Sequence, residues 1–256
     1  MFLAKLPGSY RHVSFDTLDS TNKYALKVAA EGDAGNLWVT AGQQSDGRGR
    51  RGRPWSSNEG NLFASLLLID PAPIKDIGQL PLVSAVAVHR AICDVVPPHL
   101  RGAISIKWPN DVLWDNQKIC GILLESSGLL SGHQAVVVGI GVNCRTHPDR
   151  TDGLSATNLS QSGYDVDPLA LFERLAFHMA ERLDCWNGGL GLADIREDWL
   201  SRVRGLGKPI VARLPNEEVH GVFEQLDEKG GLIMLLPDGT RRVIYAGDVF
   251  SPGTLT

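Results

Sequence analysis

The sequence predicts an α+β fold: a mixed β-sheet domain with packed helices, followed by a small antiparallel β-barrel. Residues 62–69 and 135–138 are nearly continuous apolar runs, which are typical of strands covered on both faces. Residues 80–96 and 168–186 carry apolar side chains at helical spacing. After residues 205–207 the pattern changes to short strands separated by turn residues. We therefore expect two domains, 1–205 and 206–256.

The first domain is expected to begin with a short strand at 13–15 and a helix at 22–31. Polar capping residues at 16–22 suit the start of that helix, and Gly32 suits its end. The other elements expected in this domain are strands at 37–41, 104–106, 112–114 and 118–125, and a helix at 192–203. In the second domain we expect strands at 209–214, 219–226, 232–236, 241–245 and 248–251.

The composition is that of an ordinary globular protein. Hydrophobic residues make up 43% of the 256 residues, and charged residues make up 21%. The net charge of −4 argues against a dedicated nucleic-acid binder. The four cysteines are scattered and form no CxxC pair, so we interpret them as free thiols in a reducing compartment. The sequence contains no signal-peptide pattern and no apolar run long enough for a membrane span, so we expect a cytoplasmic protein.

The strongest chemical signal is the segment 47–55, Gly-Arg-Gly-Arg-Arg-Gly-Arg-Pro-Trp. Each guanidinium is a permanently charged fork that matches a phosphate or a carboxylate. One interpretation is a segment that binds nucleic acid without sequence preference, and the other is a loop that closes on a nucleotide's phosphates. The segment occurs once, between two apolar strands, which favours the ligand loop. Because its arginines repel one another, we expect the empty loop to be mobile.

A second polar stretch, Lys107-Trp108-Pro109-Asn110-Asp111, separates two predicted strands. Alone, it predicts only a chain bend, because Asn and Asp are turn formers and Pro109 keeps Trp108 extended. A following hairpin would return Lys118 to the same region. Two lysines, an aspartate and an asparagine at converging strand ends suit a phosphate-bearing substrate, and the arginine loop makes this the favoured interpretation.

Two further segments are weak signals by themselves. Ser20-Thr21-Asn22 is by default a helix cap, although hydroxyls at a helix N-terminus can also bind a polar ligand. Gly139-Ile140-Gly141-Val142-Asn143 follows a predicted strand but lacks the third glycine of a dinucleotide-binding motif. We interpret these glycines as places where the backbone passes close to a ligand.

Together these segments resemble those of biotin protein ligases, in their order and at similar spacing. The matching segments are 19–22, Gln44, 47–55, 107–111, 118–123 and 139–143. The arginine loop combined with 107–111 is highly specific, and the resemblance extends over about residues 13–250. It implies a class II synthetase-like catalytic domain and an SH3-like C-terminal barrel.

The resemblance implies a reaction in two steps. The carboxylate of biotin attacks the α-phosphate of ATP, which gives biotinyl-5′-adenylate and pyrophosphate. A lysine of a biotin carboxyl carrier domain, such as that of acetyl-CoA carboxylase, then attacks the activated carbonyl and releases AMP. Mg²⁺ is expected with the phosphates, and the loop would close over the hydrolysis-prone adenylate.

The resemblance also implies roles for individual residues. The residues expected to bind biotin are Ser20, Thr21, Asn22, Gln44, Arg48, Gly49, Arg50, Lys118 and Gly121. Those expected to bind ATP or the adenylate are Arg50, Arg51, Arg53, Trp55, Lys107, Asn110, Asp111 and Asn143. The expected catalytic residues are Lys118, Asp111 and Arg50. Asp111 is also the candidate ligand for Mg²⁺ and the candidate group to help the incoming amine lose its proton.

Some members of this family carry an N-terminal winged helix-turn-helix and repress biotin synthesis genes. Here the motifs begin at Ser20, so we expect no DNA binding and no repressor role. One alternative is a lipoate- or octanoate-protein ligase of the same fold. The other, from a different class, is a nucleic-acid-binding protein, which would explain the arginines but not 107–111 or Lys118. The sequence leaves open whether the protein is a monomer or a homodimer.

Overall fold

The computed structural model describes residues 5–151 and 154–251, and it confirms the α+β fold. A mixed seven-stranded sheet has the order β1-β2-β3-β7-β6-β5-β4, in which β1 is parallel to β2 and the other neighbours are antiparallel. Its strands are β1 (Arg11–Leu18), β2 (Leu37–Gln44), β3 (Leu62–Ile69), β4 (Ile104–Lys107), β5 (Asp111–Trp114), β6 (Gln117–Gly128) and β7 (Gln134–Val142). The α-helices are α1 (Thr21–Ala30), α2 (Leu80–Val95), α3 (Pro168–Trp186) and α4 (Leu192–Leu200).

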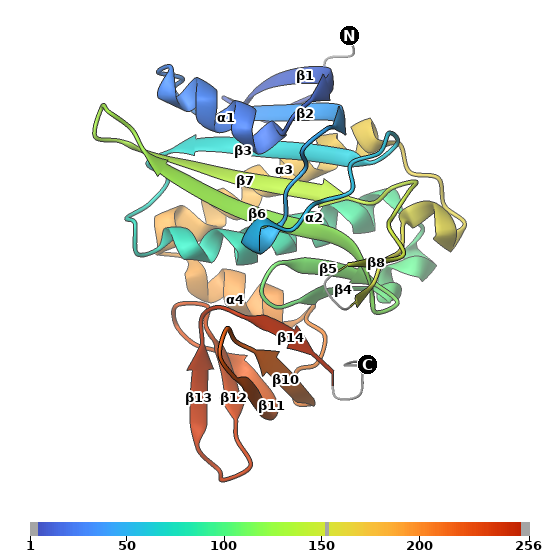
Figure 1. Cartoon of the computed structure of the whole chain (residues 1–256), viewed down its shortest axis with the longest axis vertical. Helices are drawn as coiled ribbons and strands as arrows, with labels where there is room; N and C mark the ends of the chain where they lie inside the picture. Colours follow the sequence, from blue (N-terminus) through green and yellow to red (C-terminus); the bar gives the residue numbers. More distant parts are fainter. Residues whose placement is uncertain (1–4, 152–153, 252–256) are drawn as a thin grey trace.

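Helices cover both faces of the sheet, which explains why its central strands read as continuous apolar runs. Helix α1 crosses the face seen in Figure 1, while α2 and α3 lie behind the sheet. Side chains alternate between the two faces along each strand. On β2, for example, Val39 belongs to the cluster under α1, whereas Trp38 belongs to the large core that α2 and α3 share. The helices therefore hold the sheet in place from both sides, and α1 covers only part of its front face.

Several strands, among them β1, β2, β6 and β7, are longer than the sequence indicates, and the difference in β7 matters for the site. The apolar run ends at Val138, but β7 continues to Val142, so Gly139 and Gly141 lie inside the strand rather than after it. Gly141 pairs with Phe63 of β3 on one side and with Gly121 of β6 on the other. A ladder of backbone hydrogen bonds needs no side chains, so the sheet can remain intact where side chains are missing.

The C-terminal strands form a small antiparallel sheet of order β13-β12-β11-β10-β14, which confirms the predicted small β domain. They are β10 (Pro209–Arg213), β11 (Glu218–Leu226), β12 (Leu232–Leu235), β13 (Arg241–Ile244) and β14 (Asp248–Phe250). Phe223 packs near Trp199 of α4, with ring centroids 6.4 Å apart, and both belong to the main hydrophobic core. The small sheet is thus packed onto the large domain through α4, below the main sheet in Figure 1. The predicted boundary between 205 and 206 stays a prediction.

Two other predictions concern the whole chain. All four cysteines are free, and burial raises the pKa of the Cys120 and Cys144 thiols, so neither is a ready nucleophile. Across residues 5–151 and 154–251, no helix combines the length and the apolar character that crossing a membrane requires. The cytoplasmic location stays a prediction.

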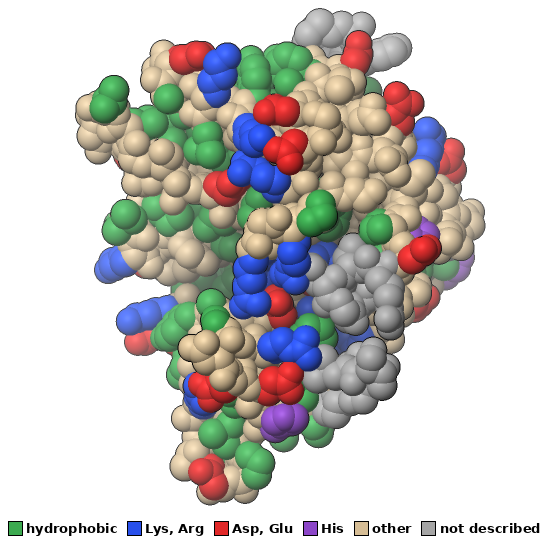
Figure 2. Space-filling model, in the orientation of Figure 1, with side chains coloured by type: hydrophobic (Ala, Val, Ile, Leu, Met, Phe, Trp, Pro, Cys, Tyr) green, Lys and Arg blue, Asp and Glu red, His purple; other side chains and the backbone are tan. Residues whose placement is uncertain are grey.

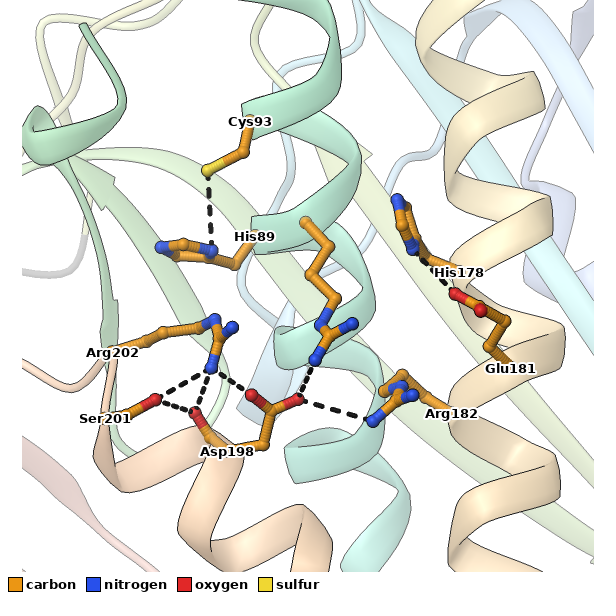
Figure 3. Close-up of polar contacts among 9 residues, drawn as sticks. His89, Cys93, His178, Glu181, Arg182, Asp198, Ser201 and Arg202 are labelled. Carbon is orange, nitrogen blue, oxygen red and sulfur yellow. Dashed lines mark hydrogen bonds and ion pairs between the residues drawn. The ribbon is translucent and has the colours of Figure 1, made fainter. Parts of the chain in front are cut away.

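A polar network ties three helices together behind the sheet (Figure 3). The carboxylate of Asp198 on α4 accepts hydrogen bonds from Arg90 of α2 at 2.8 Å and from Arg182 of α3 at 3.4 Å, and it is also ion-paired with Arg202. Next to it, His89 lies with Nδ1 3.7 Å from the thiol sulfur of Cys93. Charge-paired groups of this kind, if they lose a partner, leave an uncompensated charge inside the protein. The network therefore has a structural role, away from the candidate site.

This network predicts a pH dependence of stability. Burial, reinforced by the Arg202 guanidinium, lowers the pKa of His89 to about 4. An unfolded histidine titrates near ~6.5, so between these values the unfolded chain binds a proton that the folded chain does not. The free energy of unfolding should therefore fall as the pH falls, with His89 contributing on the order of 2 kcal/mol between pH 7 and pH 5. In urea unfolding at both pH values, His89→Gln should lack this part of the decrease in the free energy of unfolding. The exposed His220→Gln should keep it, and an unchanged pH dependence in His89→Gln would contradict the prediction.

Candidate functional site

A cavity of about 420 Å³ lies on the front face of the sheet, under the arginine loop. It is bounded by the N-terminus of α1, the end of β2, the loop, and strands β5, β6 and β7. Most of the residues predicted for ligand binding line it: Ser20, Thr21, Asn22, Gln44, Arg48, Gly49, Arg50, Arg53, Trp55, Lys107, Asn110, Asp111, Lys118 and Gly121. Arg51 and Asn143 do not line it, so their predicted contacts with the nucleotide have no direct geometric support.

Uncharged polar groups gather at one end of the cavity. The side-chain oxygen of Ser20 caps α1, and both the backbone N–H and the hydroxyl of Thr21 donate to Gln44 Oε1, at 2.9 and 3.1 Å. The hydroxyl oxygen of Ser65, from the middle of β3, lies 2.7 Å from Thr21 Oγ1 and 2.5 Å from Asn22 Oδ1. These side chains are held in place before any ligand arrives. Fixed donors and acceptors of this kind suit a small, uncharged polar head group.

A carboxylate that the sequence analysis missed belongs to this end. Asn22 Nδ2 donates to Glu125 Oε2 at 2.7 Å, and Arg48 Nη2 lies 3.3 Å from Glu125 Oε1. Glu125 therefore holds both the amide of Asn22 and the guanidinium of Arg48. Nothing in the sequence marks it, because it lies next to the apolar residues of β6 and belongs to no recognised motif. Ser65 was hidden for the same reason, inside the apolar run of β3.

Three glycines allow side chains to lie directly against this part of the sheet. A Cβ at Gly121 would lie 2.8 Å from Trp55 Cζ3, and one at Gly141 would lie 2.5 Å from Trp55 Nε1. A Cβ at Gly139 would lie 2.3 Å from Asn22 Oδ1. Real Cβ atoms do not come this close to other atoms, so only glycine allows the indole of Trp55 to lie on the sheet. The groups next to Gly139 and Gly141 in this structure are Asn22 and Trp55, so the predicted close approach of the backbone to a ligand stays a prediction.

The other end of the cavity is cationic. The β5–β6 pairing brings Lys118 back beside Asp111, as predicted: Lys118 Nζ lies 2.8 Å from Asp111 Oδ1, and Lys107 Nζ lies 3.3 Å from Asp111 Oδ2. Burial by itself raises the pKa of Asp111, but the ammonium groups of Lys118 and Lys107 outweigh it and hold this pKa below its usual value. Burial lowers the pKa of Lys107 despite the neighbouring carboxylate. Asp111 is thus a stable anion and a weak base.

The arginine loop closes this cationic end from above. It contains a short turn, η1 (Arg50–Gly52), in which Arg51 has a positive φ of 57°. Arg50 Nη1 donates to Asn110 Oδ1 at 2.8 Å, and Asn110 Nδ2 in turn donates to the carbonyl of Ile122 at 2.7 Å. Lys and Arg side chains gather on this face, between the main sheet and the small domain (Figure 2). This concentration of positive charge suits a ligand that carries several negative charges.

The predicted metal ligand does not fit a metal in this arrangement. Both oxygens of Asp111 face ammonium groups, which would repel a divalent cation. Within the described part of the chain, no cluster of three or more His, Cys, Asp or Glu side chains could hold a metal ion. The requirement for Mg²⁺ stays a prediction, and we assign no protein ligand to it.

The chain matches known families over most of its length. Residues 14–143 match the biotin/lipoate A/B protein ligase family, and residues 205–251 match the biotin protein ligase C terminal domain. The chain is 43% identical over 245 residues to a biotin–[acetyl-CoA-carboxylase] ligase of Paracoccus denitrificans, covering 92% of this chain and 98% of that protein.

Two further matches place the similarity in both sequence and structure. The chain is 33% identical over 239 residues to the bifunctional ligase/repressor BirA of Bacillus subtilis (strain 168), covering 91% of this chain and 72% of that protein. Its fold is similar to that of the biotin protein ligase from Aquifex aeolicus in complex with biotin and ATP, with a TM-score of 0.77 and 28% identity. That match covers 94% of this chain and 97% of the other.

Proposed function

This chain belongs to the biotin/lipoate A/B protein ligase family, and we propose that it attaches biotin to a carrier lysine through a biotinyl-5′-adenylate intermediate. It is a ligase of the biotin–[acetyl-CoA-carboxylase] type, with biotin and ATP as its substrates. The observation that carries the proposal is one cavity with a polar end, where the charges of Arg48 and Glu125 are paired, and a cationic end. A small polar acid and a triphosphate need these two environments side by side.

Biotin is favoured over lipoate or octanoate by the polar end of the cavity. Ser20, Thr21 and Gln44 offer fixed hydrogen-bonding groups that suit the ureido ring of biotin, whereas an octanoyl chain carries no group that could use them. The family that matches residues 14–143 includes both kinds of ligase, so it does not decide between them. The biotin ligase C-terminal domain at 205–251 supports the biotin reading.

In the first step, the carboxylate oxygen of biotin attacks the α-phosphorus of ATP, and the bond from that phosphorus to the bridging oxygen breaks to release pyrophosphate. Two anions must approach each other, so their charges must be neutralised. Lys118 and Arg48 lie where the polar end meets the cationic end and would neutralise the carboxylate. Arg50, Arg53 and Lys107 would face the phosphates. Asp111 would keep both lysines oriented.

In the second step, the amine of the carrier lysine attacks the acyl carbon, the bond to AMP breaks, and the amine loses a proton. The resemblance implied that Asp111 helps the amine to lose this proton. Its carboxylate is already shared by two ammonium groups, which makes it a poor acceptor. We therefore propose that Asp111 acts in positioning Lys118 and Lys107, that the amine arrives at the site as the neutral base, and that the proton it loses on forming the amide passes to the phosphate of the departing AMP.

We propose a biotin carboxyl carrier domain as the protein partner and no DNA partner. The net charge of −4 opposes binding to a phosphate backbone, and the concentrated positive charge lies over the cavity. We expect neither DNA binding nor a repressor role. Fluorescence anisotropy with a labelled duplex at low salt checks this, since binding that weakens with salt would point to nucleic acid.

The function is tested by mass spectrometry for an acyl-adenylate. The purified protein is incubated with ATP and Mg²⁺ and, in separate tubes, with biotin, lipoate or octanoate. We expect an adenylate with biotin alone. A lipoyl or octanoyl adenylate would keep the chemistry and overturn the substrate, and the absence of any adenylate would overturn the proposed function.

A further inference from the structure

A single carboxylate of the small domain faces three arginines of the loop. Asp248, the first residue of β14, lies with its oxygens 3.0 Å from Arg51 Nη1, 3.6 Å from Arg50 Nη1 and 3.7 Å from Arg53 Nη2. Its side chain is only 15% exposed, and it lines the cavity together with Arg50 and Arg53. Nothing in the sequence links it to the loop, because it lies almost 200 residues further along the chain, in the other domain.

The backbone beside Asp248 adds a second connection between the loop and the small domain. The carbonyl of Gly247 accepts a hydrogen bond from Arg50 Nη2 at 3.2 Å. Arg50 therefore spans the cavity mouth, from Asn110 of the large domain to the 247–248 segment of the small one. The small domain is itself held in place through the core that it shares with α4. The loop arginines are thus tied to a fixed part of the molecule.

The carboxylate occupies the position that an anionic ligand would need. Four arginines within 48–53 repel one another, and a nearby carboxylate removes much of that repulsion. The phosphates of a nucleotide would offer the same guanidiniums stronger, multiply charged acceptors. Because Asp248 and the phosphates are both negative and would adjoin the same two arginines in the cavity, they repel each other. Both cannot keep close contact with those arginines.

We propose that Asp248 is an internal counter-ion that holds the arginine loop in the ligand-free protein and gives up its arginines when the nucleotide binds. The inference rests on the proposed function, because it takes the entering polyanion to be ATP. Asp248 is a positioning residue: it acts on the reaction only through Arg50, Arg51 and Arg53. The small domain would then control how readily the loop exchanges one anionic partner for another.

The alternative is that Asp248 is a permanent anchor that keeps the loop in its productive shape. The two possibilities predict opposite changes in ATP affinity when Asp248 is neutralised. If Asp248 competes with phosphate, its neutralisation removes a competitor, so ATP should bind more tightly. The free loop should at the same time become more mobile. If Asp248 is a permanent anchor, its neutralisation should weaken ATP binding. A substitution that only damaged the fold could not tighten ATP binding.

The test compares wild type with Asp248→Asn, which keeps the shape of the side chain and removes its charge. Isothermal titration with ATP and Mg²⁺, and separately with pyrophosphate, measures affinity. Trypsin cleavage after the loop arginines measures loop mobility in the free protein. We expect Asp248→Asn to bind ATP about tenfold more tightly and to be cleaved faster when free, with ATP restoring protection. Asp248→Glu, which restores the charge, should return both properties towards wild type.

Glu217→Gln is the matched control. It removes an exposed carboxylate of the same domain, in the turn between β10 and β11, that pairs with Arg242 rather than with the loop, and it should change neither property. Weaker or unchanged ATP binding in Asp248→Asn, or unchanged cleavage of its free loop, would overturn the proposal. Adenylate formation by wild type tests the proposed function separately: a wild type that makes biotinyl-adenylate while Asp248→Asn fails to tighten ATP binding would overturn this inference alone.

Discussion

Replacing Lys118 with alanine is expected to reduce the rate of biotinyl-adenylate formation by about 10²- to 10³-fold. Lys118 is buried, lies 2.8 Å from Asp111 Oδ1, and faces the indole of Trp55 at 5.5 Å from the ring centroid. It therefore stands between the two ends of the cavity, where a carboxylate would meet the α-phosphate. Without its charge, two anions would have to approach each other with less neutralisation. Pyrophosphate release in the presence of biotin measures the loss.

The controls separate chemistry from folding. Lys75→Ala removes an exposed lysine and should leave pyrophosphate release unchanged. Because Lys118→Ala removes one of the two ammonium groups beside buried Asp111, it can also destabilise the fold, so Lys118→Gln, whose amide can still donate a hydrogen bond to that carboxylate, provides a second variant. Both variants at Lys118 should be inactive, and their circular dichroism spectra should show that they remain folded. Pyrophosphate release near the wild-type rate in a folded variant would remove Lys118 from the reaction.

The fold could be predicted from the sequence wherever apolar patterning determines the element. The strand at 62–69 and the helix at 168–186 were predicted to the residue, because burial on both faces or on one helical stripe leaves a clear pattern. The end of β7 could not be predicted, since Gly139 and Gly141 interrupt the apolar run without interrupting the backbone ladder. Pattern reasoning detects side chains, whereas strand pairing depends on the backbone.

The candidate site was predictable to the extent that its residues form dense local motifs. The loop 47–55 and the stretch 107–111 each contain several charged residues together, so they can be recognised in the sequence. The structure brings both to one cavity. Glu125, Ser65 and Asp248 are single polar residues inside or beside apolar strands. Only the sheet and the docking of the small domain bring Asp248 to the cavity, and Glu125 and Ser65 to the residues that line it, over separations of up to 197 residues along the chain. Their roles arise from tertiary structure that no local pattern encodes.

Replacing Arg50 with alanine is expected to leave adenylate formation partly intact and to release the adenylate about 10- to 100-fold faster. Arg50 is the residue that spans the cavity mouth, through Asn110 Oδ1 at 2.8 Å and the carbonyl of Gly247 at 3.2 Å. Its loss would remove the closure that keeps water from the reactive intermediate. The measurement is the amount of biotinyl-adenylate that stays with the protein after rapid gel filtration.

Arg50→Ala tests closure, whereas Lys118→Ala tests chemistry, and the two variants should fail in different ways. With Arg50→Ala, pyrophosphate should continue to appear while free biotin and AMP accumulate, because the escaped adenylate hydrolyses in water. With Lys118→Ala, little pyrophosphate should form at all. Arg241→Ala, which removes an exposed arginine paired with Glu224 on the small domain, should retain the adenylate as wild type does. Retention in Arg50→Ala equal to wild type would mean that the loop does not need this arginine to close the cavity, and the mouth would then have to be held by Arg53 and the backbone of 47–55 alone.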